Sequence, residues 1–138
     1  MIVTKVIHLQ TRGDTDIIDI TGEVGRVLAG SELKSGIATA FVAHSTAGIT
    51  TIECEPGLLG DFREAWERAA PRNAAYAHDR ELGEGNGHAH IRASILGPSI
   101  TVPFADRELV LGTWQQIVLV DFDNRPRSRK VIVQLMGE

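Results

Sequence analysis

Histidines are the residues in this chain whose type and spacing most suggest chemistry. His44 ends an apolar run, His78 lies in a long polar stretch, and His88 and His90 follow where that stretch returns to regular structure. Three neutral imidazoles with one open position form the usual ligand set of a catalytic zinc site, and imidazole also binds nickel, copper or iron. These residues therefore suggest a divalent metal, with zinc as the first expectation.

Spacing alone leaves structural explanations open for the same histidines. His44 also suits a core position whose second ring nitrogen meets a backbone carbonyl, and His78 suits a solvated loop. His88 and His90 share a face only in an extended segment, because on a helix side chains two apart diverge by about 200°. The chain contains no His-Glu-x-x-His or paired-cysteine motif that would identify the metal site more firmly.

Two carboxylates are candidates for proton transfer. Glu53 ends a β-prone run that starts just after His44, so we expect the two side chains at the ends of adjacent strands in one cleft. Asp79 directly follows His78. Either carboxylate would serve as the base for a metal-activated water or as the partner that orients a ligating imidazole.

The only basic cluster of the chain lies near its C-terminal end, over residues 125–130. In an extended segment Arg127 and Arg129 lie on one side, and their planar guanidinium groups form a fork that suits phosphate. The alternative is the end of a soluble hairpin whose charges protect an edge strand. Both interpretations stay open from the residues alone.

The bulk properties indicate one soluble domain over residues 1–138. A chain of this length buries a large enough core to fold without disulfide bonds or structural metal ions. Its contents of 43% hydrophobic and 23% charged residues are ordinary values for a globular protein. A net charge of −4 argues against a general nucleic-acid or anionic-membrane binder. Cys54 is the only cysteine, no signal-peptide pattern opens the chain, and no apolar run approaches the roughly 18 residues of a spanning helix. We therefore expect a cytoplasmic protein.

The hydrophobic periodicity predicts more strands than helices. Strands are expected over residues 2–10, 15–20, 37–43, 99–104, 109–122 (with a break at Gly112) and 128–136, and a further β-prone run ends at Glu53. Helices are expected from Thr21 to before Gly36, from Pro56 to about residue 70, and over residues 89–96, with Glu55 favourable before Pro56. This order is α+β rather than regularly alternating α/β. Residues 72–87 are left as a polar loop, and loops this long are more often functional than not.

The spaced motifs resemble, in order and over essentially the whole chain, the YjbQ-type family, which is catalogued as secondary thiamine-phosphate synthase. The residues that carry the resemblance are His44-Ser45-Thr46-Ala47, Glu53, Tyr76-Ala77-His78-Asp79, His90-Ile91, Leu111-Gly112-Thr113-Trp114-Gln115-Gln116-Ile117 and Arg129. The resemblance implies an α+β fold with a mixed or antiparallel barrel-like sheet and two to three helices, assembled as a homotrimer.

The resemblance also implies a polar pocket near the subunit junction, in which histidines bind a metal ion. The motif ligands are His44, His78 and His90, with Glu53 as the motif carboxylate and Arg129 as the motif arginine. Two further residues are added to these. His88 is a candidate substitute ligand, and Asn86 is a plausible pocket residue.

The family name implies that a pyrimidine pyrophosphate is joined to a thiazole phosphate with release of pyrophosphate. Arg127 and Arg129, or a divalent metal, would neutralise the leaving group. More broadly, three imidazoles and a carboxylate suggest a metal-dependent enzyme that acts on a small phosphorylated metabolite, with thiamine-phosphate synthesis as a secondary activity. The alternatives are a non-catalytic trimer that binds a metal or small ligand, and a purely structural trimer whose histidines fill interface pockets.

Overall fold

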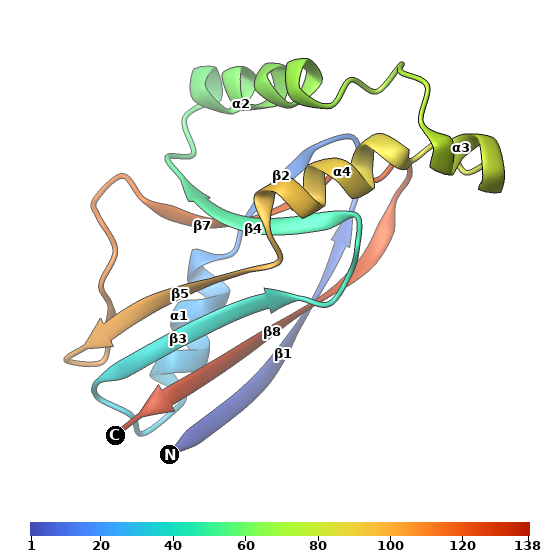
Figure 1. The fold of residues 1–138 in the computed structure, drawn as a ribbon. Helices are drawn as coiled ribbons and strands as arrows, with labels where there is room; N and C mark the ends of the chain where they lie inside the picture. The colour runs from blue at the N-terminus through green and yellow to red at the C-terminus, as the bar shows by residue number, and fades with distance from the viewer.

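Eight strands form two antiparallel sheets in the computed structural model, which describes residues 1–138 (Figure 1). The first sheet has the order β1-β8-β3-β5-β6 and the second the order β2-β7-β4, and together they curl into a half-barrel. The strands are β1 (Ile2–Thr11), β2 (Asp16–Asp19), β3 (Gly36–Val42), β4 (Ala47–Ile52), β5 (Ser99–Ala105), β6 (Glu108–Leu109), β7 (Gln116–Asp121) and β8 (Arg127–Gly137).

Four helices complete the fold: α1 (Thr21–Ala29), α2 (Pro56–Ala69), α3 (Ala77–Leu82) and α4 (Gly87–Leu96). The predicted α+β class and the antiparallel, barrel-like sheet are confirmed. The helices number four rather than two to three, because residues 77–82 of the predicted loop form α3. None of the four is long and apolar enough to cross a bilayer.

Strand β7 is shared by two apolar cores. Ile117 and Leu119 belong to the larger core, which α1 and the first sheet enclose, while Val118 and Val120 belong to a smaller core with Trp66 of α2. A strand buried on both faces is expected to be apolar at nearly every position. This explains the uninterrupted apolar run of β7 and makes it the central strand of the molecule.

Helix α2 begins where the sequence predicts. Pro56 is its first residue, and the Glu55 carboxylate accepts hydrogen bonds of 2.8 Å from the backbone N–H groups of Gly57 and Leu58. These two hydrogen bonds lower the pKa of Glu55. The carboxylate therefore stabilises the start of the helix as an N-cap, which agrees with the sequence interpretation.

Helix α4 lies directly against β4 because residue 48 has no side chain. A Cβ atom at Gly48 would be 2.8 Å from the carbonyl oxygen of Gly97 and 2.8 Å from Cδ2 of Leu96. The same carbonyl oxygen of Gly97 accepts a hydrogen bond of 3.1 Å from the backbone N–H of Ile49. This close approach fixes α4, and with it His90, relative to the second sheet.

We predict that Gly48→Ala lowers the free energy of unfolding by about 1–3 kcal/mol, because the added methyl group forces α4 away from β4. Urea unfolding followed by circular dichroism measures the change. Gly60→Ala is the matched control, since a Cβ there meets nothing within 4 Å and should stabilise α2 by roughly 0.5–1 kcal/mol. Equal stability of Gly48→Ala and the wild type would contradict the close approach.

Candidate functional site

A polar cavity of about 680 Å³ lies where the β3–β4 loop, the start of α4 and the beginning of β8 meet. His44 lines it from the loop, Asn86 and His90 from the start of α4, and Arg127 and Arg129 from β8. These segments are far apart in the sequence and come from both sheets. The fold thus brings five of the predicted site residues to one cavity.

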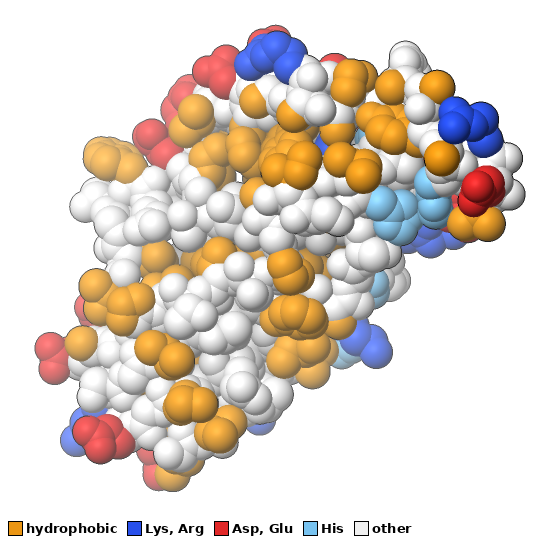
Figure 2. All heavy atoms as spheres, in the orientation of Figure 1, with side chains coloured by type: hydrophobic (Ala, Val, Ile, Leu, Met, Phe, Trp, Pro, Cys, Tyr) orange, Lys and Arg blue, Asp and Glu red, His pale blue; other side chains and the backbone are white.

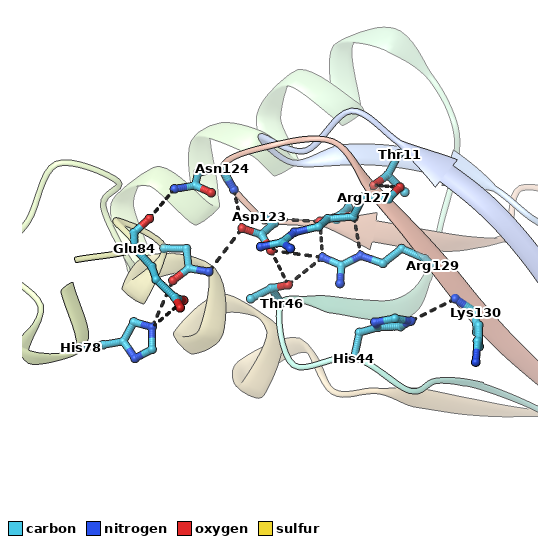
Figure 3. A network of polar contacts seen from close by, with 12 residues as sticks. Thr11, His44, Thr46, His78, Glu84, Asp123, Asn124, Arg127, Arg129 and Lys130 are labelled. Atoms are coloured by element: carbon cyan, nitrogen blue, oxygen red, sulfur yellow. Dashed lines mark hydrogen bonds and ion pairs between the residues drawn. The ribbon is translucent and has the colours of Figure 1, made fainter. Parts of the chain in front are cut away.

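His78, Glu84 and His90 form a cluster at the edge of this cavity. One ligand atom from each residue lies within 4.8 Å of the others. The ring centroids of His78 and His90 are 4.6 Å apart, and His78 Nε2 is 3.6 Å from Glu84 Oε2 (Figure 3). Two imidazoles and one carboxylate are the protein ligands of many catalytic zinc sites and of non-haem iron sites. The cluster, which we call the metal cluster, fits a divalent transition metal.

The chain turns sharply between α3 and α4 to form this cluster. Gly83 and Gly85 both have φ of +68°, a left-handed conformation that glycine adopts at little cost. Asp79, a predicted catalytic carboxylate, accepts a hydrogen bond of 2.8 Å from the N–H of Gly87 at the start of α4. Asp79 does not line the cavity, and its observed role is to join the two helices. The turn places Glu84 between the two histidines.

Asn86 connects the metal cluster to the acidic and basic residues deeper in the cavity. Its side chain is 3% exposed, its Oδ1 lies 3.1 Å from Nε2 of His78, and its Nδ2 donates to Oδ1 of Asp123 at 3.3 Å. Asn86 was predicted as a pocket residue, and the structure places it on the cavity wall. An amide in this position links the orientation of His78 to the arginine side of the site.

Arg129 is held by a buried ion pair rather than left free. The side chain is 4% exposed, and it donates through Nε and Nη2 to both carboxylate oxygens of Asp121, at 2.6 and 2.8 Å. Nη2 also donates to Oγ1 of Thr46 at 2.6 Å. Figure 3 shows one guanidinium nitrogen of Arg129 without a dashed line, between Thr46 and His44. Only this nitrogen is left for a ligand.

Arg127 is the more available of the two arginines. Its Nε donates to Oδ2 of Asp123 at 2.9 Å, but its two terminal nitrogens make no hydrogen bond within the chain, and its side chain is 30% exposed. Asp121 and Asp123 balance the charges of the two arginines. The predicted fork for phosphate therefore lies on the cavity wall, but carboxylates neutralise it.

His44 lines the same cavity as His90 but does not belong to the metal cluster. Its Nε2 accepts a hydrogen bond of 3.0 Å from the backbone N–H of Lys130. Burial, and then the charge of Arg129, lower the pKa of His44, so the ring is neutral at pH 7. His44 is a neutral imidazole of the cavity wall that lies outside the cluster of His78, Glu84 and His90, and its role as a metal ligand stays a prediction.

His88 lies on another side of α4 from His90, as expected for two residues two apart on a helix. Its side chain is 1% exposed and lines a separate small hollow, and burial, followed by the charges of Arg92 and Arg72, lowers its pKa. His88 therefore lies outside the cluster of His78, Glu84 and His90.

Glu53 lies at the opposite end of β4 from His44. Residue Ala47, at the start of β4, pairs with Asp121, whereas Ile52, just before Glu53, pairs with Gln116. At about 3.3 Å per residue this strand separates its two ends by roughly 17–20 Å. The two residues flank one strand instead of ending two adjacent strands, so they do not share a cleft within one chain.

Sequence reasoning missed three carboxylates of this site. Glu84 lies six residues after His78 and six before His90, and the glycines on both sides of it were the only signal that the chain turns back there. Asp121 ends an apolar strand and Asp123 begins a turn, so nothing local indicated that they hold the arginines.

We predict that Asp123 makes the stability of the protein depend on acid pH. Burial alone would raise its pKa, but hydrogen bonds from the Asn124 N–H and from the side chains of Thr46, Arg127 and Asn86 lower it below the ordinary 3.8. The resulting stabilisation is present above that ordinary value and is lost as the pH falls through the lower folded pKa.

In urea unfolding, Asp123→Asn should cost about 1–3 kcal/mol at pH 7, and this cost should shrink below about pH 4. Asp61→Asn, at an exposed position of α2, is the control and should change stability by less than about 0.5 kcal/mol at either pH. A cost for Asp123→Asn that is the same at pH 7 and pH 3 would refute this assignment.

Comparison with known proteins supports one family over nearly the full length. The family model described as UPF0047 protein YjbQ-like matches residues 5–138. A UPF0047 protein of Archaeoglobus fulgidus is 39% identical over 93% of this chain and 97% of its own length. The UPF0047 protein YugU of Bacillus subtilis is 35% identical over 96% and 98%, respectively.

Solved structures agree with these sequence relatives. A YbjQ-like protein of unknown function from Sulfolobus solfataricus superimposes with a TM-score of 0.94 at 34% identity, over 100% of this chain and 99% of its own. An uncharacterised YjbQ/UPF0047 protein from Clostridium acetobutylicum gives a TM-score of 0.87 at 36% identity, over 96% and 99%. The resemblance that the motifs indicated is therefore confirmed, and this chain belongs to the YjbQ-like UPF0047 family.

Proposed function

We propose that this protein is a metal-dependent enzyme that acts on a small phosphorylated metabolite. The observation that carries the proposal is the metal cluster of His78, Glu84 and His90, at the edge of a cavity whose wall also holds Arg127 and Arg129. A metal-dependent reaction of a phosphorylated substrate needs residues that bind the cation and residues that bind the phosphate, and both kinds lie at this cavity. Zinc is the divalent metal that this donor set fits best.

The charges around the cavity support a link between the cation and the phosphate. Asp121 and Asp123 neutralise the two arginines, and Glu84 adds a further negative charge. A phosphate dianion would find no net attraction to such a wall. A divalent cation at the metal cluster reverses the balance, so phosphate binding at this cavity should require the metal.

The residues of the chain then divide the remaining tasks. A bound divalent cation supplies Lewis acidity, which polarises a phosphoryl oxygen or activates a water molecule. The free terminal nitrogens of Arg127 would hold phosphoryl oxygens, while Asp121 keeps Arg129 in a fixed position beside them. His44 is neutral and accepts the Lys130 N–H at Nε2, which leaves the proton on Nδ1. Its Nδ1–H would therefore donate a hydrogen bond to a bound phosphoryl oxygen.

Thiamine-phosphate synthesis, which the family resemblance implies, is proposed as a secondary activity of the same cavity. The released pyrophosphate carries several negative charges, and a cation together with Arg127 would stabilise it. Glu53 keeps its predicted role as a base only for a cavity shared between subunits, where a neighbouring chain brings it to the site.

The second candidate function is a non-catalytic trimer that binds a metal or a small ligand. One observation favours it: within one chain every carboxylate at the cavity already has a partner or a place in the metal cluster. No free carboxylate is left as a base. Turnover of phosphorylated metabolites separates the two functions, because the enzyme proposal requires turnover that Arg127→Gln abolishes and the binding proposal requires none.

The homotrimer is also proposed, and the outer face of the first sheet supports it. Strand register aligns Thr4, Gln134, Thr39 and Thr101 in a row across β1, β8, β3 and β5. Apolar rows flank it on both sides and include the half-exposed Ile2, Met136, Val6 and Phe41. Figure 2 shows this face with orange and white side chains, while the charged ones gather near its margins. So few charges on an exposed sheet face favour burial against other subunits.

We predict that protein purified without an affinity tag carries about one equivalent of a divalent transition metal per chain. Glu84→Gln and His90→Ala should each lower the metal content at least tenfold, because each removes a ligand. His8→Ala is the matched control, since His8 is an exposed residue of β1 outside the cluster. Elemental analysis gives the result, and unchanged metal content in both cluster variants would contradict the proposal.

We predict that Thr39→Lys dissociates the trimer, because it places a charge at the centre of the uncharged sheet face. Light scattering after size exclusion should give three times the 15.0 kDa chain mass for the wild type and a monomer for the variant. Glu32→Lys, at an exposed position between α1 and β3, should leave the mass unchanged. A trimeric Thr39→Lys protein would exclude this face as the interface.

A further inference from the structure

A second polar hollow lies on the other side of α4, away from the metal cluster. It has a volume of about 150 Å³ and lies between the β1–β2 turn, helix α2 with the segment that follows it, and α4. At about 30 Å³ per water molecule, this volume corresponds to roughly five water molecules. No hydrophobic residue lines it. Such a volume suits a small polar ligand and not a whole metabolite.

Three arginines from different elements line this hollow, together with only two carboxylates. Each carboxylate is already paired: Arg72 binds Asp14, and Nη2 of Arg92 lies 2.9 Å from Oε2 of Glu67. Arg63 is the third arginine and makes no ion pair. Pairing of opposite charges therefore leaves one positive charge at the hollow without a partner.

The two outer arginines have uncommitted hydrogen-bond donors. Arg63 is exposed and uses only Nε, which donates to the carbonyl oxygen of Thr15 at 3.1 Å, and Arg72 makes its side-chain hydrogen bond through Nη1 alone. Arg92, in contrast, is 4% exposed and fixed, because Nε donates to Ala70 and Nη1 to Thr15 in addition to the pair with Glu67. A fixed guanidinium lies at the base, and two that retain free donors lie near solvent.

His88 gives an independent indication of a missing ligand. His88 lines the hollow and is 1% exposed, and its side chain makes no hydrogen bond within the chain. Its Nδ1 is among only two buried side-chain polar atoms that have no partner. Buried polar groups are almost always satisfied, so a buried imidazole without a partner beside a polar hollow points to a polar ligand.

We propose that this hollow binds a tetrahedral oxyanion of the size of phosphate or sulfate, held by Arg63 and Arg72 against Arg92 and His88. Guanidinium groups bind such oxygens through paired, charge-assisted hydrogen bonds. The site is separate from the proposed metal-dependent cavity, and it does not depend on the enzymatic proposal. Because the ligand connects α2 to α4, its binding should also stabilise the folded protein.

The test measures binding of inorganic phosphate by calorimetry and by the ¹⁵N resonances of the His88 ring, in protein treated with a chelator. Phosphate should shift the His88 resonances and raise the melting temperature of the wild type. Arg63→Gln should weaken phosphate binding at least tenfold. Arg68→Gln is the matched control, since it changes an arginine of the same helix that does not line the hollow, and it should bind phosphate as the wild type does.

Arg127→Gln separates this site from the metal-dependent cavity. It should keep the phosphate-dependent shift of His88, because Arg127 lines the other cavity. Sulfate should compete with phosphate for the site, because both are tetrahedral oxyanions of similar size. Equal phosphate affinity of Arg63→Gln and the wild type, or no response of His88 to phosphate, would overturn the proposal.

Discussion

The buried ion pair between Arg129 and Asp121 is the interaction on which the site depends. Asp121 ends β7 in the second sheet and Arg129 lies on β8 in the first, so the pair joins the two sheets at the cavity. Both side chains are almost fully buried, and removing one partner of such a pair leaves a costly buried charge. Thr46 completes the pair from the β3–β4 loop and thereby fixes the segment that carries His44.

The same network determines what the cavity can bind. A free pair of arginines would attract phosphate by itself, but here Asp121 and Asp123 cancel their charges. The arginines thus supply geometry and donors but no net positive charge, which the proposed cation would provide. Asn86 forms the structural link, because it contacts both His78 of the metal cluster and Asp123 of the network. The proposed cation and the proposed phosphorylated ligand would therefore bind this cavity together.

Much of the fold could be predicted from the sequence, because apolar periodicity reports burial directly. The apolar run of β7 and the Glu55–Pro56 start of α2 are examples in which the local signal is strong. Helix α3 was missed because its six residues carry no buried side chain and therefore no periodicity. Local patterns fail where an element is short, polar and held by contacts from elsewhere in the chain.

The site was predicted only in part, for the same physical reason. Histidines and arginines could be identified by type, and the fold places His90 and both arginines at one cavity. The partners that fix them are distant in sequence, as Glu84, Asp121 and Asp123 show. His44 and Glu53 do not meet within one chain, because they lie at opposite ends of β4. Residue types therefore indicated the chemistry, while strand pairing decided which residues meet.

The position of a bound metal tests this account most directly. Crystals of the zinc-loaded protein should be measured with X-rays above and below the zinc absorption edge. The account predicts one anomalous peak per chain, about 2.0–2.2 Å from a ring nitrogen of His78, a ring nitrogen of His90 and a carboxylate oxygen of Glu84. A chain without a peak between these three residues, or with zinc bound only elsewhere, would contradict it.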